Sequence, residues 1–199
     1  EKMLSFASSL SPDSDAFVIF VTEKYVYKDK RDVLSSDTVQ KINSFLSVLK
    51  VKKKEEDISS IDISDRQKCF IIRVKNKYNS YFPQERGGAF FSHLKKFKDI
   101  GKVDLYPDSL DFESDKLVGF FSEFICGFTL KSYKFNKYKT LNKKEIDKKI
   151  NFKIVTSNRS KIEKKYKYYD AIREGVFLTR DLVSEIGRAH VWTPVTCLS

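Results

Sequence analysis

Histidine and cysteine, the side chains that most often carry out chemistry, are few in this sequence and lie far apart. The 199 residues contain two His and three Cys. A zinc site needs about four His, Cys or carboxylate ligands at workable spacing. Before residue 186 the chain holds one His and two Cys, which lie far apart: His93, Cys69 and Cys126. His93 lies among phenylalanines and is interpreted as a structural or surface histidine. The two cysteines lie in apolar patterns and are interpreted as small core residues rather than nucleophiles.

Phosphate-binding loops and paired carboxylates are equally poorly represented. The segment "ERGGAF" places Gly87 and Gly88 at the start of an expected helix, where backbone amides can meet an anion. It lacks the spacing of either nucleotide fingerprint, so a tight loop-to-helix turn is the preferred explanation. The pairs Glu55–Glu56 and Asp104 with Asp108 lie in charge-mixed or turn contexts, and we expect them to be solvated. These residues predict no catalytic, cofactor-binding or metal site within this chain.

The composition is that of one folded domain. Apolar residues make up 41% and aromatic residues 14% of the chain, with only four Pro and seven Gly, which is enough for a real core. No apolar run approaches the roughly 18 residues of a membrane span, so no membrane partner is expected. The widely spaced cysteines form neither a disulfide framework nor a CxxC pair, which predicts a reducing, cytoplasmic environment.

The formal net charge of +11 has two interpretations. It can indicate a nucleic-acid or anionic-membrane partner, or simply a lysine-rich solvated surface, which we prefer because acids are interleaved with most of the lysines. The densest mixture of basic and aromatic residues is "LKSYKFNKYKT", residues 130–140. Such a segment could stack bases and pair phosphates.

Hydrophobic periodicity predicts strands that alternate with helices. Short apolar runs predict strands near 15–22, 69–74, 102–107 and 149–158. Helical spacing predicts helices over 35–50, 84–101, 113–135 and 159–185. We expect the wide apolar stripe of the third helix to be buried, with Phe120, Phe121, Phe124 and Phe128 in the core. We expect the last helix to bury Ile162, Tyr166, Tyr169, Ile172, Val176 and Thr179. Alternating strands and helices predict an α/β fold in which helices cover both faces of a mixed sheet.

Two stretches resemble the N-terminal domain of the leucyl aminopeptidases, which are also called cytosol aminopeptidases. That domain carries the pattern small-Gly-x-x-Leu-x-x-Tyr-x-Phe-x-x-Tyr-Lys-Thr, which this chain matches at Gly127, Leu130, Tyr133, Phe135, Tyr138, Lys139 and Thr140. It ends in Glu-Gly-Val-x-x-x-Arg-Asp-Leu-Val-Asn-Glu-Pro, matched at Glu174, Gly175, Val176, Arg180, Asp181, Leu182, Val183 and Glu185. Ser184 replaces the Asn of that pattern. The Gly-Leu-Gly that usually follows the second strand is "VKN" here.

The resemblance implies a fold and a division of the chain. Residues 1–160 would form a macro-domain-like unit, and residues 161–185 a linker helix toward a missing C-terminal catalytic domain. In the family the metal ligands and the catalytic residues lie in that second domain, whose motifs do not occur in this chain. The resemblance therefore implies two divalent metal ions, Mn or Zn, in a full-length parent and none in this fragment. It also implies a homo-hexameric parent that acts on peptides.

Residues 186–199 differ in character from the rest of the chain. This segment, "IGRAHVWTPVTCLS", contains the only Trp of the chain and no Lys. It resembles the translation of a sequencing-library adapter, and the family pattern breaks at the same place, after Glu185. We therefore expect a non-native tail, extended and poorly packed, in which His190, Trp192 and Cys197 have no functional role. The last helix should end within a few residues of Glu185.

The preferred functional interpretation is a truncated N-terminal domain of a two-metal leucyl aminopeptidase. The parent would release N-terminal amino acids from peptides, whereas the fragment would be inactive and would serve assembly and active-site access. The alternative is a free-standing basic binding module for nucleic acid or an ADP-ribose-type ligand.

Overall fold

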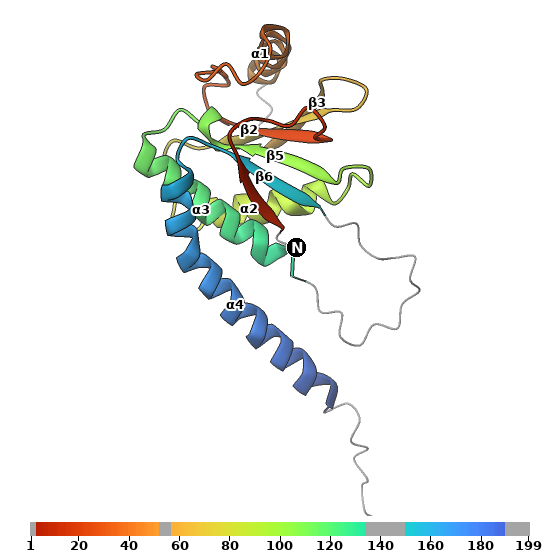
Figure 1. Cartoon of the computed structure of the whole chain (residues 1–199), viewed down its shortest axis with the longest axis vertical. Helices are drawn as coiled ribbons and strands as arrows, with labels where there is room; N and C mark the ends of the chain where they lie inside the picture. Colours follow the sequence, from red (N-terminus) through yellow and green to blue (C-terminus); the bar gives the residue numbers. More distant parts are fainter. Residues whose placement is uncertain (1–2, 52–56, 134–149, 190–199) are drawn as a thin grey trace, which may run out of the picture.

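The computed structural model describes residues 3–51, 57–133 and 150–189, in which a sheet lies between helices on both of its faces (Figure 1). The described strands are β1 (Leu4–Ala7), β2 (Ala16–Thr22), β3 (Ile58–Asp62), β4 (Lys68–Val74), β5 (Lys102–Tyr106) and β6 (Asn151–Val155). The described helices are α1 (Ser36–Val51), α2 (Phe82–Leu94), α3 (Ser114–Lys131), α4 (Arg159–Ala189) and the short 3₁₀ helix η1 (Pro107–Ser109). The fold class is therefore the mixed α/β class predicted from the sequence.

The sheet has the order β1-β6-β5-β2-β4-β3, and β3 is antiparallel to its neighbour β4 while the other pairs are parallel. The four predicted strands are β2, β4, β5 and β6, which occupy the interior of the sheet. The two strands that the sequence did not predict, β1 and β3, are the edges. Edge strands are only partly buried, so their apolar pattern is weak.

The central strand β2 separates two hydrophobic cores. All seven of its residues are buried, and they point alternately to the two faces. Phe17, Ile19 and Val21 face α1, whereas Val18 and Phe20 face α2 and α3. A strand that contributes to two cores has a continuous apolar sequence. This explains why "DAFVIFVT" could be predicted as a strand from the sequence.

The predicted aromatic stripe of α3 is confirmed. Phe120, Phe121, Phe124 and Phe128 have relative exposures of 2%, 0%, 0% and 0%. Phe20 of β2 meets three of them edge to face, with ring-centroid distances of 6.2, 5.7 and 5.2 Å. Aromatic edge-to-face geometry adds to the free energy gained by burial, so this cluster anchors α3 on the sheet.

Helices α2 and α3 cross at two glycines. A Cβ atom at Gly87 would lie 2.0 Å from the carbonyl oxygen of Phe124, and one at Gly127 would lie 2.0 Å from that of Gln84. The prediction that the Gly87–Gly88 pair forms a loop-to-helix turn is wrong, because both residues lie inside α2. Gly87 allows two helix backbones to touch, which is a different reason for glycine.

Helix α2 also ends earlier than predicted, at Leu94 instead of near Gly101. The amides of Gly101 and Lys102 donate hydrogen bonds of 2.7 and 2.8 Å to the carboxylate of Asp15, at the start of β5. These bonds hold the first residue of β5 next to the residue that precedes β2. Residues 95–100 therefore form the connection, from which Phe97 still packs on Phe70 at 5.2 Å.

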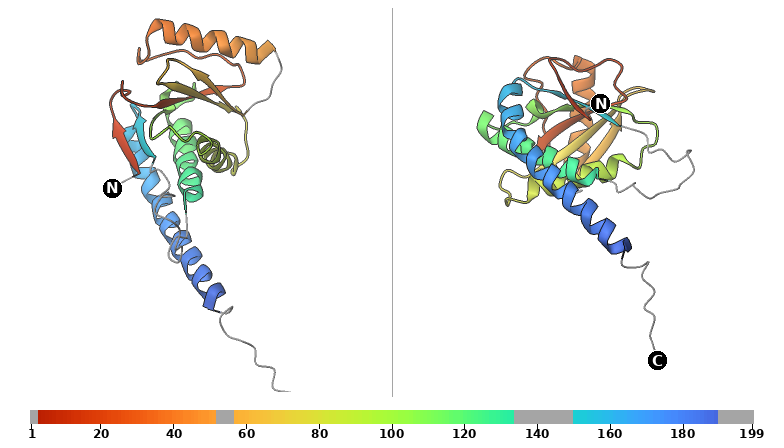
Figure 2. Two further views of the ribbon diagram at one scale, coloured as in Figure 1. Left: turned by 90° about the vertical axis from the view of Figure 1, so that its right-hand side faces the viewer. Right: turned by 60° about the horizontal axis from the view of Figure 1, so that its bottom comes forward.

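Helix α4 starts against the sheet and extends away from it, as both views in Figure 2 show. Its predicted buried stripe is partly wrong. Ile162 is fully buried, and Tyr166, Tyr169 and Val176 are partly buried, but Ile172 and Thr179 are exposed. At 3.6 residues per turn, these two residues lie roughly a quarter turn around the helix from Ile162, outside the stripe that contacts α3.

The helix passes the point where we expected the non-native tail to begin. α4 continues to Ala189, so it ends within a few residues of Glu185 as predicted, and residues 186–189 are helical rather than extended. Adding residues to an existing helix costs far less than nucleating one, which accounts for the continuation. Residues 190–199, with His190, Trp192 and Cys197, lie outside the described residues.

Candidate functional site

The end of α3 and the second half of α4 form a junction of polar and aromatic contacts. The Tyr133 hydroxyl donates a 2.6 Å hydrogen bond to Oδ1 of Asp181. The Arg180 guanidinium donates to the carbonyl oxygen of Leu130 at 3.2 Å and lies over the Tyr133 ring at 5.4 Å. The Tyr133 and Phe177 rings are 4.9 Å apart. We call Leu130, Tyr133, Phe177, Arg180 and Asp181 the helix junction.

Further toward the sheet, α4 is held on α3 by buried and partly buried side chains. Ile162 belongs to the main core. The Tyr169 hydroxyl donates to Glu123 at 3.1 Å, and burial together with the Glu123 charge raises the pKa of Tyr169 to about 12. The phenol is therefore protonated at neutral pH and remains a donor. These contacts fix the direction in which α4 leaves the domain.

At the carboxyl ends of the strands, Asp108 connects the loop that follows β2 with the loop that follows β6. Its carboxylate accepts hydrogen bonds from the Thr156 hydroxyl at 2.6 Å, from the Ser157 amide at 2.7 Å and from Arg31 at 2.9 Å. Arg31 also donates to the carbonyl oxygen of Ser8 at 3.5 Å. Open α/β sheets usually bind ligands at this edge. Here a network within the chain occupies the polar groups of that edge.

The carboxylates Asp104 and Asp108 are not solvated, which corrects the prediction from the sequence. Asp104 has a relative exposure of 2%, and its carboxylate accepts the Ser11 amide at 2.5 Å. Burial raises the pKa of Asp104, although the Ser11 hydrogen bond and the Lys153 charge act in the opposite direction. The Asp108 side chain is 8% exposed. Both residues therefore hold loops on the sheet. Glu55 and Glu56 lie outside the described residues.

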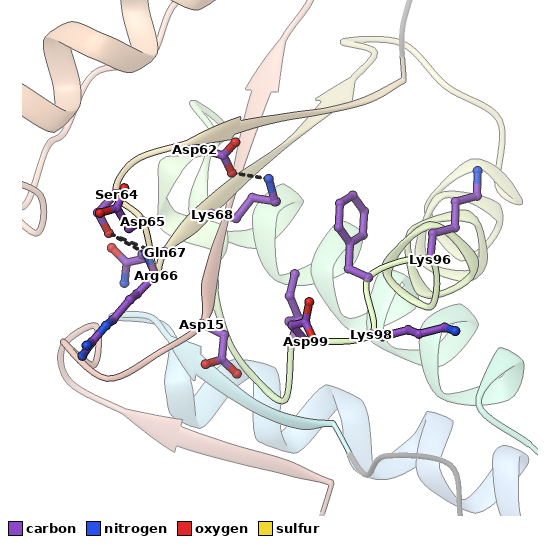
Figure 3. A pocket seen from close by; sticks show the side chains of 12 residues that line it. Asp15, Asp62, Ser64, Asp65, Arg66, Gln67, Lys68, Lys96, Lys98 and Asp99 are labelled. Carbon is purple, nitrogen blue, oxygen red and sulfur yellow. Dashed lines mark hydrogen bonds and ion pairs between the residues drawn. The ribbon is translucent and has the colours of Figure 1, made fainter. Parts of the chain in front are cut away.

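A hollow of about 640 Å³ lies at the opposite edge, where β2, β4 and β5 begin (Figure 3). Its lining includes four carboxylates and four basic side chains: Asp15, Asp62, Asp65, Asp99, Arg66, Lys68, Lys96 and Lys98. Asp62 pairs with Lys68, and Asp15 binds the backbone of the β5 entrance. The balance of charges and these structural roles favour no particular ligand class.

The histidine and the cysteines are placed as the sequence predicts. Cys69 and Cys126 are free and buried in the cores, and burial raises the pKa of both thiols. Such thiols are poor nucleophiles at neutral pH. His93 lies beside the rings of Phe70 and Phe97, at centroid distances of 6.0 and 5.6 Å. Burial and the Lys96 charge lower its pKa, so the ring is a neutral packing element.

Within residues 3–51, 57–133 and 150–189, no group of three or more His, Cys, Asp or Glu side chains is placed to hold a metal ion. In the same residues, no helix combines the length and the apolar content that crossing a membrane requires.

Sequence comparison relates the chain to one class of enzyme. It is 35% identical over 101 residues to a probable cytosol aminopeptidase of Agrobacterium fabrum, and 35% identical over 104 residues to one of Phytoplasma mali. A third relative, from Rhizobium etli, is 33% identical over 102 residues. The chain is homologous to cytosol aminopeptidases over about half of its length. It spans only about a fifth of the length of these curated relatives. No family model matches the chain.

Solved structures show the same fold. A mutant of tomato leucine aminopeptidase superposes with a TM-score of 0.62 at 17% identity, and the match covers 90% of this chain and 38% of the tomato chain. The macrodomain of Thermus aquaticus DarG gives 0.50 at 8% identity over 77% of this chain and 97% of its own. The bottromycin maturation enzyme BotP gives 0.52 at 11% identity. The chain is therefore macrodomain-like, as predicted.

The helix junction is where the two stretches that resemble cytosol aminopeptidases meet. Leu130 and Tyr133 come from the first motif, and Arg180 and Asp181 come from the second. The sequence showed both motifs but not their contact. The motif residues Phe135, Tyr138, Lys139 and Thr140 lie outside the described residues, as does most of the basic-aromatic segment 130–140.

Proposed function

We propose that this chain is the N-terminal domain of a leucyl aminopeptidase, with residues 161–185 as a linker helix toward a catalytic domain. The observation that carries the proposal is that the match covers most of this chain but only a minor part of the longer enzymes. The fold match covers 90% of this chain but only 38% of the tomato enzyme. The part of the chain that resembles aminopeptidases in sequence likewise corresponds to about a fifth of the curated relatives. Both comparisons fit a domain of a longer enzyme.

The longer parent would release N-terminal amino acids from peptides. Two divalent ions, manganese or zinc, would supply an activated water and polarise the scissile carbonyl in its second domain. BotP, which shares the fold, has been solved in complex with manganese. The described residues of this chain supply no matching donor set, so no catalytic step is assigned to them, and we propose that the chain by itself is inactive.

The role that remains for this domain is positional. The helix junction fixes α4, and α4 would fix the direction of the catalytic domain relative to the sheet. In a hexameric parent such a domain would contribute to assembly and limit access of peptides to the active site. The name of the relatives supports a cytoplasmic location.

A free-standing module for nucleic acid or an ADP-ribose-type ligand is the alternative, and the DarG macrodomain is the observation in its favour. Against it, the Asp108 carboxylate accepts hydrogen bonds from Arg31, Thr156 and Ser157 at the carboxyl edge, where a ligand of an α/β sheet would lie. The sequence similarity also favours an aminopeptidase, because all three relatives described above are named probable cytosol aminopeptidases.

The decisive experiment is to sequence the genomic DNA beyond the codon for Glu185. We expect an open frame that continues through Pro and Asn into a domain with the Lys, Asp and Glu residues of a two-metal peptidase. An in-frame stop codon directly after Glu185 in genomic DNA would contradict the proposal and favour the free-standing module.

The activity of the two proteins gives a second test. The recovered full-length enzyme should hydrolyse a leucine amide when Mn²⁺ or Zn²⁺ is added, and the 199-residue chain should show no hydrolysis with either ion. Calorimetric titration of the short chain with Mn²⁺ should show no stoichiometric binding. Tight binding of one or two ions to the short chain would overturn the assignment of the metals to the second domain.

A further inference from the structure

Helix α4 has two faces that differ in what they contact. One face carries Ile162, Tyr169, Phe177 and Arg180, which pack on the core or on α3. A residue two positions further along a helix lies about 200° around its axis. The opposite face therefore carries a second row of residues, which begins at Tyr168. Figures 1 and 2 show that this part of α4 extends beyond the sheet.

The second row has the spacing of a coiled-coil seam. Its members follow one another at alternating intervals of four and three residues, the pattern of the a and d positions of a heptad: Tyr168, Ile172, Gly175, Thr179 and Leu182. All five are exposed, with relative exposures of 68%, 40% and 50% for the three large members Tyr168, Ile172 and Leu182. We call these five residues the outer seam. A Cβ atom on Gly175 would meet no other atom within 4 Å, so the centre of the seam is open.

The residues beside the outer seam are also apolar. Leu178 and Val183 flank it and are 62% and 63% exposed. The charged residues of α4 between 168 and 184 all lie off the seam and its flanks, at Asp170, Arg173, Glu174, Arg180 and Asp181. A helix face that holds Tyr168, Ile172 and Leu182 at heptad spacing, with small uncharged residues between them, is suited to another helix rather than to solvent, nucleic acid or a small ligand.

We propose that the outer seam binds the outer seam of a second copy of this chain, in an antiparallel two-helix coiled coil. The sizes of the outer seam residues favour a second copy of the chain as the partner. If two copies cross with residue 177 at the centre, Ile172 faces Leu182 of the other copy, and Gly175 faces Thr179. Large residues then meet large ones and small residues meet small ones. A parallel pair would instead stack glycine on glycine and leave a gap at the centre.

The shape of the domain permits this pairing. The sheet lies at the amino end of α4 (Figure 2), so an antiparallel pair has its two sheets at opposite ends. The contact with α3 uses the other face of α4 and is undisturbed. Ile186 would extend the seam by one layer and is 68% exposed, but it lies in the segment expected to be foreign, and the proposal does not depend on it.

The exposed apolar area indicates a weak dimer. If the large residues of the seam and its flanks each bury on the order of 100 Å², the pair buries about 1,000 Å² in total, the lower limit for a specific interface. Each copy also carries a net charge of +11, and repulsion between copies is screened by salt. We therefore expect a micromolar monomer–dimer equilibrium that moves toward dimer as the ionic strength increases.

Sedimentation equilibrium of the whole chain, from about 1 to 500 µM, tests the proposal. The expected result is a dimer that forms with concentration. Ile172→Glu and Leu182→Lys should each increase the dimer dissociation constant by about tenfold or more, because each buries a charge against an apolar residue. The exposed positions Lys167→Ala and Glu174→Gln are matched controls with the same changes of net charge, and they should leave the dissociation constant unchanged.

The double variant Ile172→Glu/Leu182→Lys distinguishes the orientation. In the antiparallel pair each introduced glutamate would face the introduced lysine of the other copy, so dimerisation should return to within about tenfold of the original. In a parallel pair like charges would face one another, and the double variant would be the weakest. A monomer at every concentration, a dimer indifferent to both single changes, or no recovery in the double variant would overturn the proposal. None of these results depends on whether the parent is an aminopeptidase.

Discussion

Tyr133 and Asp181 are 48 positions apart in the chain, and the tyrosine hydroxyl donates a 2.6 Å hydrogen bond to the aspartate carboxylate. Tyr133 lies just beyond the end of α3, and Asp181 lies in the last third of α4. The bond joins the two helices beside the contact between the Tyr133 and Phe177 rings, whose centroids are 4.9 Å apart. It therefore holds the second half of α4 against the end of α3.

Replacing Tyr133 with Phe removes that bond while retaining the ring. We expect amide hydrogens of residues 177–185 to exchange faster with solvent, because the second half of α4 loses a hydrogen bond to the end of α3. Hydrogen exchange followed by mass spectrometry measures this. Tyr168→Phe is the matched control, because Tyr168 lies on the same helix and is 68% exposed. Equal effects of the two changes would show that the hydrogen bond has no role in holding α4.

Gly127→Ala tests the close approach of α2 and α3. The new methyl group would lie 2.0 Å from a backbone carbonyl oxygen, so the helices must separate. We expect a loss of at least about 2–3 kcal/mol in chemical denaturation. Gly175→Ala makes the same chemical change where nothing lies within 4 Å. Alanine there should increase the stability by up to about 1 kcal/mol, because it favours the helical conformation. Similar losses in both variants would contradict the steric explanation.

Asp57 should make the domain sensitive to acid. Partial burial alone would raise its pKa, but hydrogen bonds and charge from Arg86 at 2.8 Å and Arg73 at 3.2 Å outweigh burial, and the pKa of Asp57 is lowered. A lowered pKa in the folded state stabilises the fold above the unfolded-state pKa of about 4, and this contribution is lost as the pH falls below it.

We expect Asp57→Asn to reduce the slope of stability against pH below about pH 4, measured as melting temperature from pH 7 to pH 2. The control is Asp115→Asn, because the Asp115–Lys161 pair is 94% and 58% exposed and exposed pairs contribute little. A slope that is unchanged in the Asp57 variant would rule out a role for this ion-pair cluster.

Deleting residues 186–199 should change the melting temperature by no more than about 1–2 °C. The described side chain of this segment, Ile186, is 68% exposed, and changes at exposed positions usually stay within about 0.5 kcal/mol. Differential scanning calorimetry of the chain with and without this segment makes the comparison. A decrease of many degrees would mean that the segment is a native part of the fold.

The sequence by itself determined the interior of this protein. The strands β2, β4, β5 and β6 and the helices α1, α3 and α4 have strong apolar periodicity because they face one or two cores, and periodicity of burial is what a sequence records. The phenylalanines of α3 and the buried Cys69 and Cys126 could be assigned for the same reason. The two aminopeptidase motifs were visible because they are short, continuous patterns.

Only the tertiary structure decided what depends on contacts between distant residues. The edge strands β1 and β3 pair through backbone hydrogen bonds, which any side chain permits. Asp104 and Asp108 appeared to be surface residues, and their burial depends on Ser11 and Thr156, which are far away in the chain. Gly87 suggested a turn in the sequence, whereas its actual reason is the close approach of the Phe124 backbone in α3. Ile172 and Thr179 are apolar or small residues at helical spacing, so the sequence predicted them to be buried. Which face of α4 is buried depends on where α3 ends, and the local sequence of α4 does not contain that information.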